Sequence, residues 1–196
     1  MKVLYFLLTF LESGLAIFGI RSPLEQPRYR VMSTLREGVE LRSYGPLPVV
    51  ETNMSGGDGE AFSRLFRYIT GANKTGATIK MTVPVAQTGS ARFGSGAVGS
   101  GGATMQFVLP AKIAADPPAP TDPDVKLATV PARTLAVIRF SGSFGKRNLD
   151  AHLATLRKVI AATGRKADGP PVFLGYDPPF TIPFLRRNEV ALEVEP

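Results

Sequence analysis

The sequence contains no cysteine, no tryptophan and a single histidine among its 196 residues. Without cysteine the chain can form no disulfide, no thiolate metal site and no cysteine nucleophile. With His152 as its one histidine, a zinc site is not expected, and a Ser-His-Asp arrangement would be no better than chance. The lack of tryptophan does not prevent a core, because 44% of the residues are hydrophobic and suffice for one domain.

Acidic residues are fewer than basic ones, 16 against 23, which gives a net charge of +7. Nucleic-acid-binding domains usually concentrate basic residues on one face or in one motif. Here the basic residues are scattered along the chain in pairs such as Arg28/Arg30 and Arg165/Lys166, which is typical of a solvated surface. No nucleic-acid partner is therefore expected, whereas an anionic small ligand or membrane head groups suit the charge.

One long apolar run is present, from Val3 to Ile20, and Glu12 interrupts it. A run of about 18 residues is borderline for a membrane-spanning helix. A short apolar stretch followed by the triplet Gly14-Leu15-Ala16 is also typical of a signal peptide. Both interpretations predict an exported protein, periplasmic or membrane-anchored, and a buried helix of the domain is the alternative. The expected organisation is a signal peptide or membrane anchor at 1–20, a linker at 21–27 and a folded domain at 28–196.

The rest of the chain alternates turn residues with short apolar segments. Seventeen prolines and twenty glycines imply many turns, which suits a β-rich or α+β fold. Apolar residues at helical spacing predict two helices, at 60–70 and 148–162. Strands are expected at 29–31, 39–44, 49–53, 78–83, 104–109, 125–128, 135–140, 172–176 and 188–195. This order of strands, helix and strands, given twice, predicts an antiparallel sheet built from two similar halves.

The segment Gly94–Gly99, GSGAVG, has the glycine spacing of a phosphate-binding loop. Such a loop needs a hydrophobic strand before it and a helix after it, so that the helix N-terminus meets the phosphates. No helical pattern follows Gly99, so we interpret the segment as a hairpin loop.

Six segments, taken together, resemble the SOUL heme-binding protein family. They are VELRSYGPLPVVET, AFSRLFRYITGANKTGATIKMTVPV, FVLP, PPAPTD, VIRFSG and GYDPPFTIPFLRRNEV, and the resemblance spans residues 28–194. It implies an α+β fold, a distorted antiparallel β-barrel with two α-helices, built from two similar strand-helix-strand halves. It also implies a tetrapyrrole ligand, heme or a porphyrin, held by a non-enzymatic carrier or buffer.

The resemblance also implies where the ligand binds. Heme is a wide apolar plate with two carboxylates, so its site needs an apolar slot and cations at the rim. In the heme-binding relatives the first helix and the YDPP segment border the pocket. That would carry over to Phe62, Phe66, Arg67 and Tyr176 of this sequence, with Met81 as a further candidate.

The sequence departs from the family pattern at a position that concerns the iron. Some members carry a histidine after the arginine of the ELR-x-Y element, proposed as an axial ligand, and here that position is Ser43. A bond from the protein to the iron would then need His152, a methionine or a tyrosine. We expect binding through apolar contacts and propionate pairing instead, and weak or absent heme affinity stays open.

Two other functions also stay open. A small-molecule hydrolase or effector-sensing domain of the same architecture would need an acid or a base in a cleft. Glu51 and Glu189 are candidates for that role, but neither has a partner that is evident from the sequence. The other alternative is an envelope interaction protein that has no ligand.

Overall fold

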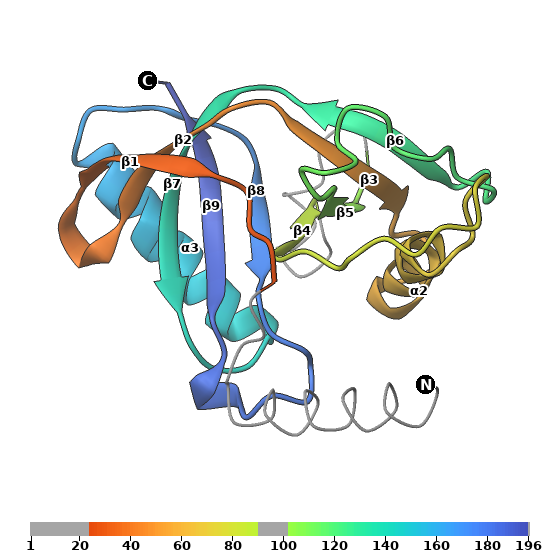
Figure 1. Ribbon diagram of the computed structural model, residues 1–196. Coiled ribbons are helices and arrows are strands. Elements are labelled where there is room, and N and C mark those ends of the chain that lie inside the picture. The colour runs from red at the N-terminus through yellow and green to blue at the C-terminus, as the bar shows by residue number, and fades with distance from the viewer. Residues whose placement is uncertain (1–23, 90–101, 196) are drawn as a thin grey trace.

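The computed structural model describes residues 24–89 and 102–195. Within these ranges nine strands form one sheet that carries two α-helices (Figure 1). The helices are α2 (Asp58–Ile69) and α3 (Lys146–Ala161), with short 3-10 helices η1 (Arg36–Gly38) and η3 (Pro183–Leu185). The strands are β1 (Tyr29–Thr34), β2 (Glu40–Tyr44), β3 (Leu47–Asn53), β4 (Val85–Thr88), β5 (Thr104–Val108), β6 (Val125–Val130), β7 (Arg133–Phe140), β8 (Ala167–Gly175) and β9 (Asn188–Val194).

The strand order β1-β2-β7-β9-β8-β4-β5-β3-β6 explains the two similar halves. One half is β3-α2-β4-β5 and the other is β7-α3-β8-β9. Along the sheet, one half runs β7-β9-β8 and the other continues as β4-β5-β3. The second half therefore repeats the strand order of the first in reverse. Every pairing is antiparallel, and β4 joins β8 at the centre. The sheet is strongly curled (Figure 1), which confirms the predicted α+β class with two similar halves.

Each helix covers its own half of the sheet and buries an apolar stripe against it. α2 packs on β3, β5 and β6, where Leu65 and Tyr68 are buried, and α3 packs on β7, β8 and β9 through Leu149 and Leu156. Both helices were predicted from this spacing, and each observed end lies within two residues of its prediction. A third apolar cluster, which contains Leu174, lies on the other face of the sheet, because neighbouring residues of a strand face opposite sides.

One predicted strand is wrong. The segment 78–83 alternates apolar and polar residues, but its pairing is an isolated bridge between Glu25 and Thr82, and β4 begins later, at Val85. Ile79 is buried in the α2 cluster and Val83 in the cluster on the opposite face. Ile79 and Val83 share one phase of the alternation yet are buried on opposite faces, so the period did not report one face of a paired strand.

Two predictions fall on residues outside the described ranges: the segment 1–20 and the loop Gly94–Gly99. Within residues 24–89 and 102–195, no helix is both long and apolar enough to cross a bilayer.

Candidate functional site

The solvent side of α2 carries two phenylalanines side by side. The rings of Phe62 and Phe66 stack with their centroids 5.9 Å apart, and the side chains are 39% and 46% exposed. Residues four apart lie on one stripe of a helix, and the neighbouring stripe, with Ala61 and Leu65, is buried. Beneath Phe62, the buried ring of Phe107 from β5 meets it edge to face at 5.4 Å. The two rings thus form an exposed aromatic surface, and Phe62 is supported by the core.

This surface continues across the sheet toward the junction of the two halves. Phe107 pairs with Val85 of β4, and Val85 pairs with Gly175 of β8. Cross-strand partners lie on the same face of a sheet, so the three residues extend the row that starts on α2. A Cβ atom on Gly175 would lie 3.4 Å from a ring carbon of Phe173. With glycine at this position, no side chain projects from this end of the row. We call Phe62, Phe66, Phe107 and Val85 the apolar shelf.

Two more of the sequence-predicted residues lie near α2 but differ in their surroundings. Met81 is half-buried and packs against the same core cluster as Phe107, which places it with the shelf. The guanidinium of Arg67 instead pairs with Asp122, just before β6, with Nη2 and Oδ2 3.3 Å apart. Arg67 is exposed, so this is a surface ion pair of about 0–1 kcal/mol that another carboxylate can replace.

Tyr176 lies on the opposite face of the sheet from the shelf. It follows Gly175 directly and belongs to the third apolar cluster, with Tyr44 and Leu174. Its hydroxyl donates a hydrogen bond to Oε2 of Glu189 at 2.8 Å. The structure therefore does not bring Tyr176 together with Phe62 and Phe66.

A buried charge cluster, made of Arg42, Tyr176, Arg187 and Glu189, occupies that opposite face. The side chain of Glu189 is fully buried and accepts hydrogen bonds from Nη1 of Arg42 at 2.8 Å and from Nη2 of Arg187 at 2.7 Å. The guanidinium of Arg187 also lies over the ring of Tyr176, 3.7 Å from its centroid. Glu189 therefore has partners from three segments of the chain, although the sequence showed none.

The pKa values in the cluster follow from this arrangement. Burial alone would raise the pKa of Glu189, but the hydrogen bond and charge of Arg42, and then those of Arg187, outweigh it and hold that pKa below its usual value. Burial, and next the carboxylate of Glu189, raise the pKa of Tyr176. Glu189 is thus a paired, ionised carboxylate at neutral pH, and it is a poor proton acceptor.

His152, the weak candidate for an iron ligand, lies on α3 in the other half from the shelf. Its Nδ1 is 2.8 Å from the carbonyl oxygen of Asn148, and because a carbonyl only accepts, Nδ1 carries the proton. The imidazole stacks on Phe140 with the centroids 4.2 Å apart. Among the residues that the structure describes, no group of three or more His, Asp or Glu side chains could hold a metal ion.

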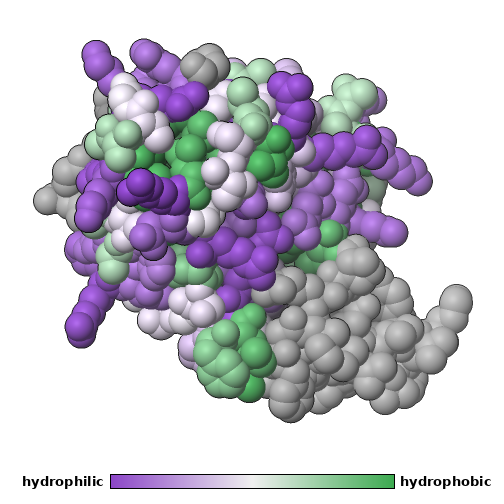
Figure 2. Space-filling view, turned by 90° about the vertical axis from the view of Figure 1, so that its left-hand side faces the viewer, coloured by the Kyte–Doolittle hydropathy of each residue, from purple (hydrophilic) through white to green (hydrophobic). Residues whose placement is uncertain are grey.

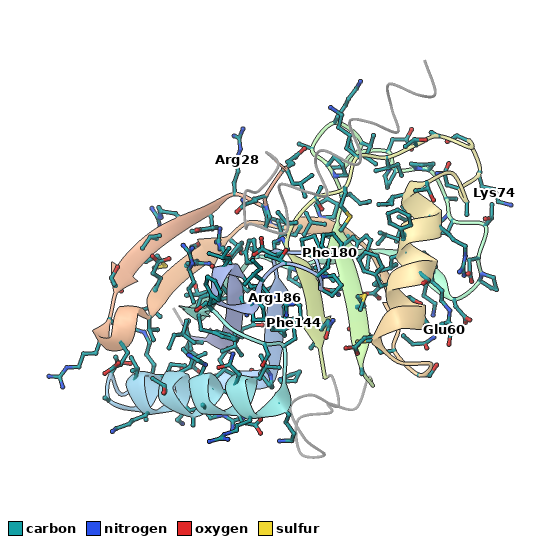
Figure 3. All side chains as sticks on the ribbon, turned by 90° about the horizontal axis from the view of Figure 1, so that it is seen from below. Arg28, Glu60, Lys74, Phe144, Phe180 and Arg186 are labelled. Carbon is teal, nitrogen blue, oxygen red and sulfur yellow. The ribbon has the colours of Figure 1, made fainter. Side chains whose placement is uncertain are left out.

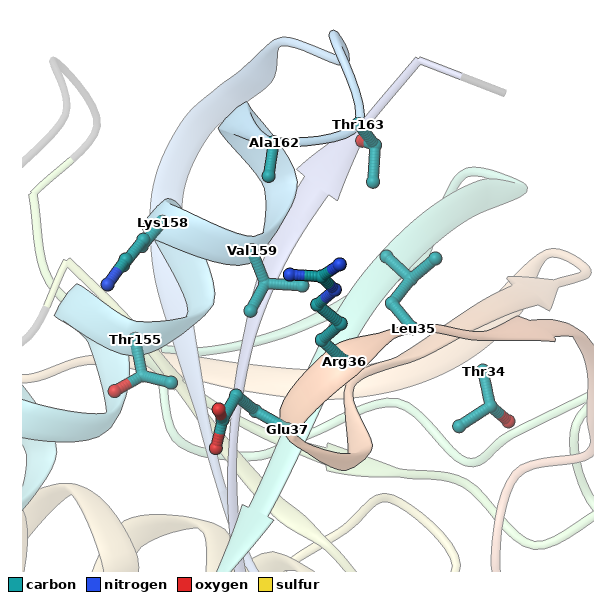
Figure 4. A pocket seen from close by; sticks show the side chains of 9 residues that line it. All are labelled: Thr34, Leu35, Arg36, Glu37, Thr155, Lys158, Val159, Ala162 and Thr163. Atoms are coloured by element: carbon teal, nitrogen blue, oxygen red, sulfur yellow. The ribbon is translucent and has the colours of Figure 1, made fainter.

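A groove of about 790 Å³ lies between η1 and the C-terminal half of α3 (Figure 4). Figure 4 shows the side chain of Arg36 extending beside Val159, while Lys158 points away from it. The volume falls in the usual range for ligand pockets, but the lining is mixed rather than a flat apolar wall. The lining residues are Thr34, Leu35, Arg36, Glu37, Thr155, Lys158, Val159, Ala162 and Thr163. This groove is separate from the apolar shelf, and no sequence-predicted site residue belongs to it.

Known proteins resemble this chain over most of its length. A family model described as SOUL heme-binding protein matches residues 24–193. Heme-binding protein 2 of Mus musculus is 33% identical over 195 residues, which cover 92% of this chain and 91% of the relative. Heme-binding protein 2 of Homo sapiens is 31% identical over 159 residues, with 78% and 76% covered. Heme-binding protein 1 of Bos taurus is 31% identical over 137 residues, with 68% of each chain covered.

Solved structures share the fold at much lower identity. The C-terminal domain of EcmrR superposes with a TM-score of 0.55 at 12% identity, covering 85% of this chain and 98% of that domain. A hydrolase from Listeria innocua superposes with a TM-score of 0.54 at 11% identity, covering 89% and 94%. At this level of identity the likeness concerns the fold alone.

Proposed function

The chain belongs to the SOUL heme-binding protein family, and we propose that it binds heme or another tetrapyrrole on the apolar shelf as a non-enzymatic carrier or buffer. The observation that carries this proposal is the stacked, exposed pair Phe62 and Phe66 above the buried ring of Phe107. A flat macrocycle can cover both exposed rings at once, and each large apolar side chain that is buried contributes about 1.5–3 kcal/mol. The names of the relatives, heme-binding proteins 1 and 2, support the ligand class.

The rim of the shelf offers a cation for a propionate. Arg67 follows Phe66 in α2, is exposed, and is engaged by Asp122 in a surface ion pair. A propionate can take the place of Asp122 at small cost, because exposed pairs of this kind contribute about 0–1 kcal/mol. If the macrocycle covers Phe62 and Phe66, one of its propionate carboxylates then lies near the guanidinium of Arg67.

The surroundings of the two candidate carboxylates, Glu51 and Glu189, support a non-enzymatic function. A general base works best when its pKa is near the operating pH. Glu189 is ionised and held by two guanidinium groups, and Glu51 accepts a hydrogen bond from Nε2 of Gln106 at 2.8 Å on the β3–β5 pair. Neither carboxylate belongs to the shelf or lines the η1–α3 groove.

Phe66→Ala should weaken heme binding by roughly 1–3 kcal/mol, the contribution of one buried aromatic side chain. A titration followed by the Soret band of the bound heme measures the change. Met32→Ala, on β1, is the matched control because Met32 and Phe66 are both 46% exposed. The control should bind heme as the wild-type chain does.

The same titration separates the shelf from the groove. Unchanged affinity in a folded Phe66→Ala variant would exclude the shelf. A loss in Lys158→Glu instead would move the binding site to the η1–α3 groove. A wild-type chain that gives no bound Soret band with heme and no spectral change with protoporphyrin would overturn tetrapyrrole binding itself.

His152→Ala should leave the heme spectrum and the affinity nearly unchanged. The imidazole lies on α3, the helix that covers the half away from the shelf, and is held by Asn148 of that helix and by Phe140 of β7. Iron-free protoporphyrin should accordingly bind within about tenfold of heme, a difference of roughly 1.4 kcal/mol. A shifted Soret band or a large loss of affinity in the variant would instead make α3 the iron-binding wall.

A further inference from the structure

The connection between β8 and β9, Asp177–Arg187, carries two phenylalanines that stand out from the surface. Phe184 is 71% exposed and Phe180 is 55% exposed, more than any other large apolar side chain in the described ranges. Figure 1 places this blue connection at the lower end of the molecule, and Figure 2 shows a hydrophobic cluster at the lower edge of its face. We call this connection the aromatic loop.

The aromatic loop is held in shape by its own hydrogen bonds. Nε of Arg186 donates to the carbonyl oxygen of Thr181 at 2.7 Å, and its Nη2 donates to that of Pro179. The same guanidinium lies over the ring of Phe144, 4.6 Å from its centroid, and Figure 3 shows the two side chains together, with Phe180 close by in that view. The backbone N–H of Gly142 donates to the carbonyl oxygen of Pro183 at 2.8 Å. The exposed rings are therefore presented by a preorganised loop, which lowers the entropic cost of binding.

The described chain begins against the same loop. Nη1 of Arg187 donates to Oε1 of Gln26 at 3.3 Å, so the residues that follow the apolar run lie beside the end of the loop. Ile20, where that run ends, is four residues before Leu24. An extended chain spans at most about 3.6 Å per residue, so Ile20 lies within roughly 14 Å of Leu24. The apolar run therefore ends a few residues before the part of the chain that contacts the aromatic loop.

We propose that the aromatic loop docks on a lipid bilayer and inserts Phe180 and Phe184 at the interface. Aromatic side chains are favoured at the boundary of head groups and acyl chains, where apolar surface can be buried. The aromatic loop contains one acidic residue, Asp177, against the two arginines Arg186 and Arg187, and the net charge of the chain is +7. Both features suit an anionic bilayer, since basic groups are attracted to its negative surface potential.

The absence of tryptophan allows a direct test in the full-length chain. Phe184→Trp introduces the one indole at an exposed position of the loop, and Met32→Trp introduces it on β1 as the matched control. Each protein is mixed with vesicles of phosphatidylcholine and phosphatidylglycerol, with or without bromine on the acyl chains. The fluorescence of Phe184→Trp should shift to the blue and be quenched several-fold more by brominated lipid than that of Met32→Trp.

Flotation of the same vesicles measures how much of each protein is bound to them. The double variant Phe180→Ser, Phe184→Ser should float several-fold less than the wild-type chain at low protein concentration. Phe184→Trp protein that floats with the vesicles but is quenched no more than Met32→Trp would overturn the docking surface. Protein that does not float at all would overturn it as well, while heme binding on the shelf would be unaffected.

Discussion

Glu189→Gln should lower the free energy of unfolding by about 3 kcal/mol, the lower end of the range for breaking a buried ion pair. The change removes the charge that faces both Arg42 and Arg187, and Arg42 is itself buried on β2. Glu40 still accepts a hydrogen bond from Nε of Arg42 at 2.7 Å, which keeps the loss from being larger. Denaturant unfolding followed by circular dichroism, with linear extrapolation to water, measures the change.

Glu51→Gln is the matched control, since it makes the same chemical change at a half-buried glutamate whose partner is the neutral Gln106. It should cost less than about 1 kcal/mol, because an amide can keep that single hydrogen bond. Similar losses in the two variants would mean that the charge cluster does not stabilise the fold through its charges.

The pH dependence gives this prediction a second readout. The folded-state pKa of Glu189 is lowered, so its carboxylate stabilises the fold at pH values above its unfolded pKa of about 4.3. That contribution is lost as the pH falls through the lower, folded-state pKa. The difference in stability between the wild-type chain and Glu189→Gln should therefore be largest near neutral pH and shrink on acidification.

The parts of the fold that sequence predicts well are those that depend on local periodicity. α2 buries Ala61, Leu65, Tyr68 and Ile69 at helical spacing, so both its position and its exposed side could be inferred. The same rule failed at 78–83, where Ile79 and Val83 alternate with polar residues but are buried on opposite faces, and the pairing is an isolated bridge at Thr82. The periodicity of a segment does not show which strand it pairs with, and a segment forms a strand only when it has such a partner.

The candidate site likewise has features that the sequence predicts and features that depend on the fold. Phe62 and Phe66 could be placed on one face of a helix, but their support by Phe107 depends on how α2 crosses β5. The pairs Arg42–Glu189 and Arg67–Asp122 join residues far apart in the sequence, and no local pattern contains them. Tyr176 was expected beside the shelf from the resemblance alone, and the alternation of side chains at the end of β8 directs it to the other face.

Asn73 shows how a turn can hide a structural role. The stretch that follows α2 indicates a turn from its glycines and asparagine. In the structure the side chain of Asn73 is buried, and its Nδ2 donates to the carbonyl oxygens of Tyr68 at 3.0 Å and Ala77 at 2.8 Å. Its Oδ1 accepts from the hydroxyl of Thr75 at 2.8 Å. Composition predicted the turn, but the satisfaction of these particular groups emerged only from the three-dimensional path of the chain.

Phe107→Ala should lower the free energy of unfolding by about 3–5 kcal/mol, the usual cost of removing a buried aromatic ring. Phe107 is buried in the α2 cluster, and its strand lies between β3 and β4, so the cavity would open beneath the helix. Its ring is also the support of Phe62. The variant should therefore bind heme more weakly even where it is fully folded, because the shelf loses its floor.

Two further substitutions separate the cavity from the loss of an aromatic ring. Phe107→Leu keeps most of the buried volume and should recover much of the stability, since the cost grows with the size of the cavity. Phe180→Ala removes the same side chain from an exposed position and should change stability by no more than about 0.5 kcal/mol. A loss below about 1 kcal/mol in Phe107→Ala would mean that α2 does not depend on this ring. Unchanged heme binding in the folded variant would mean that Phe62 needs no support from β5.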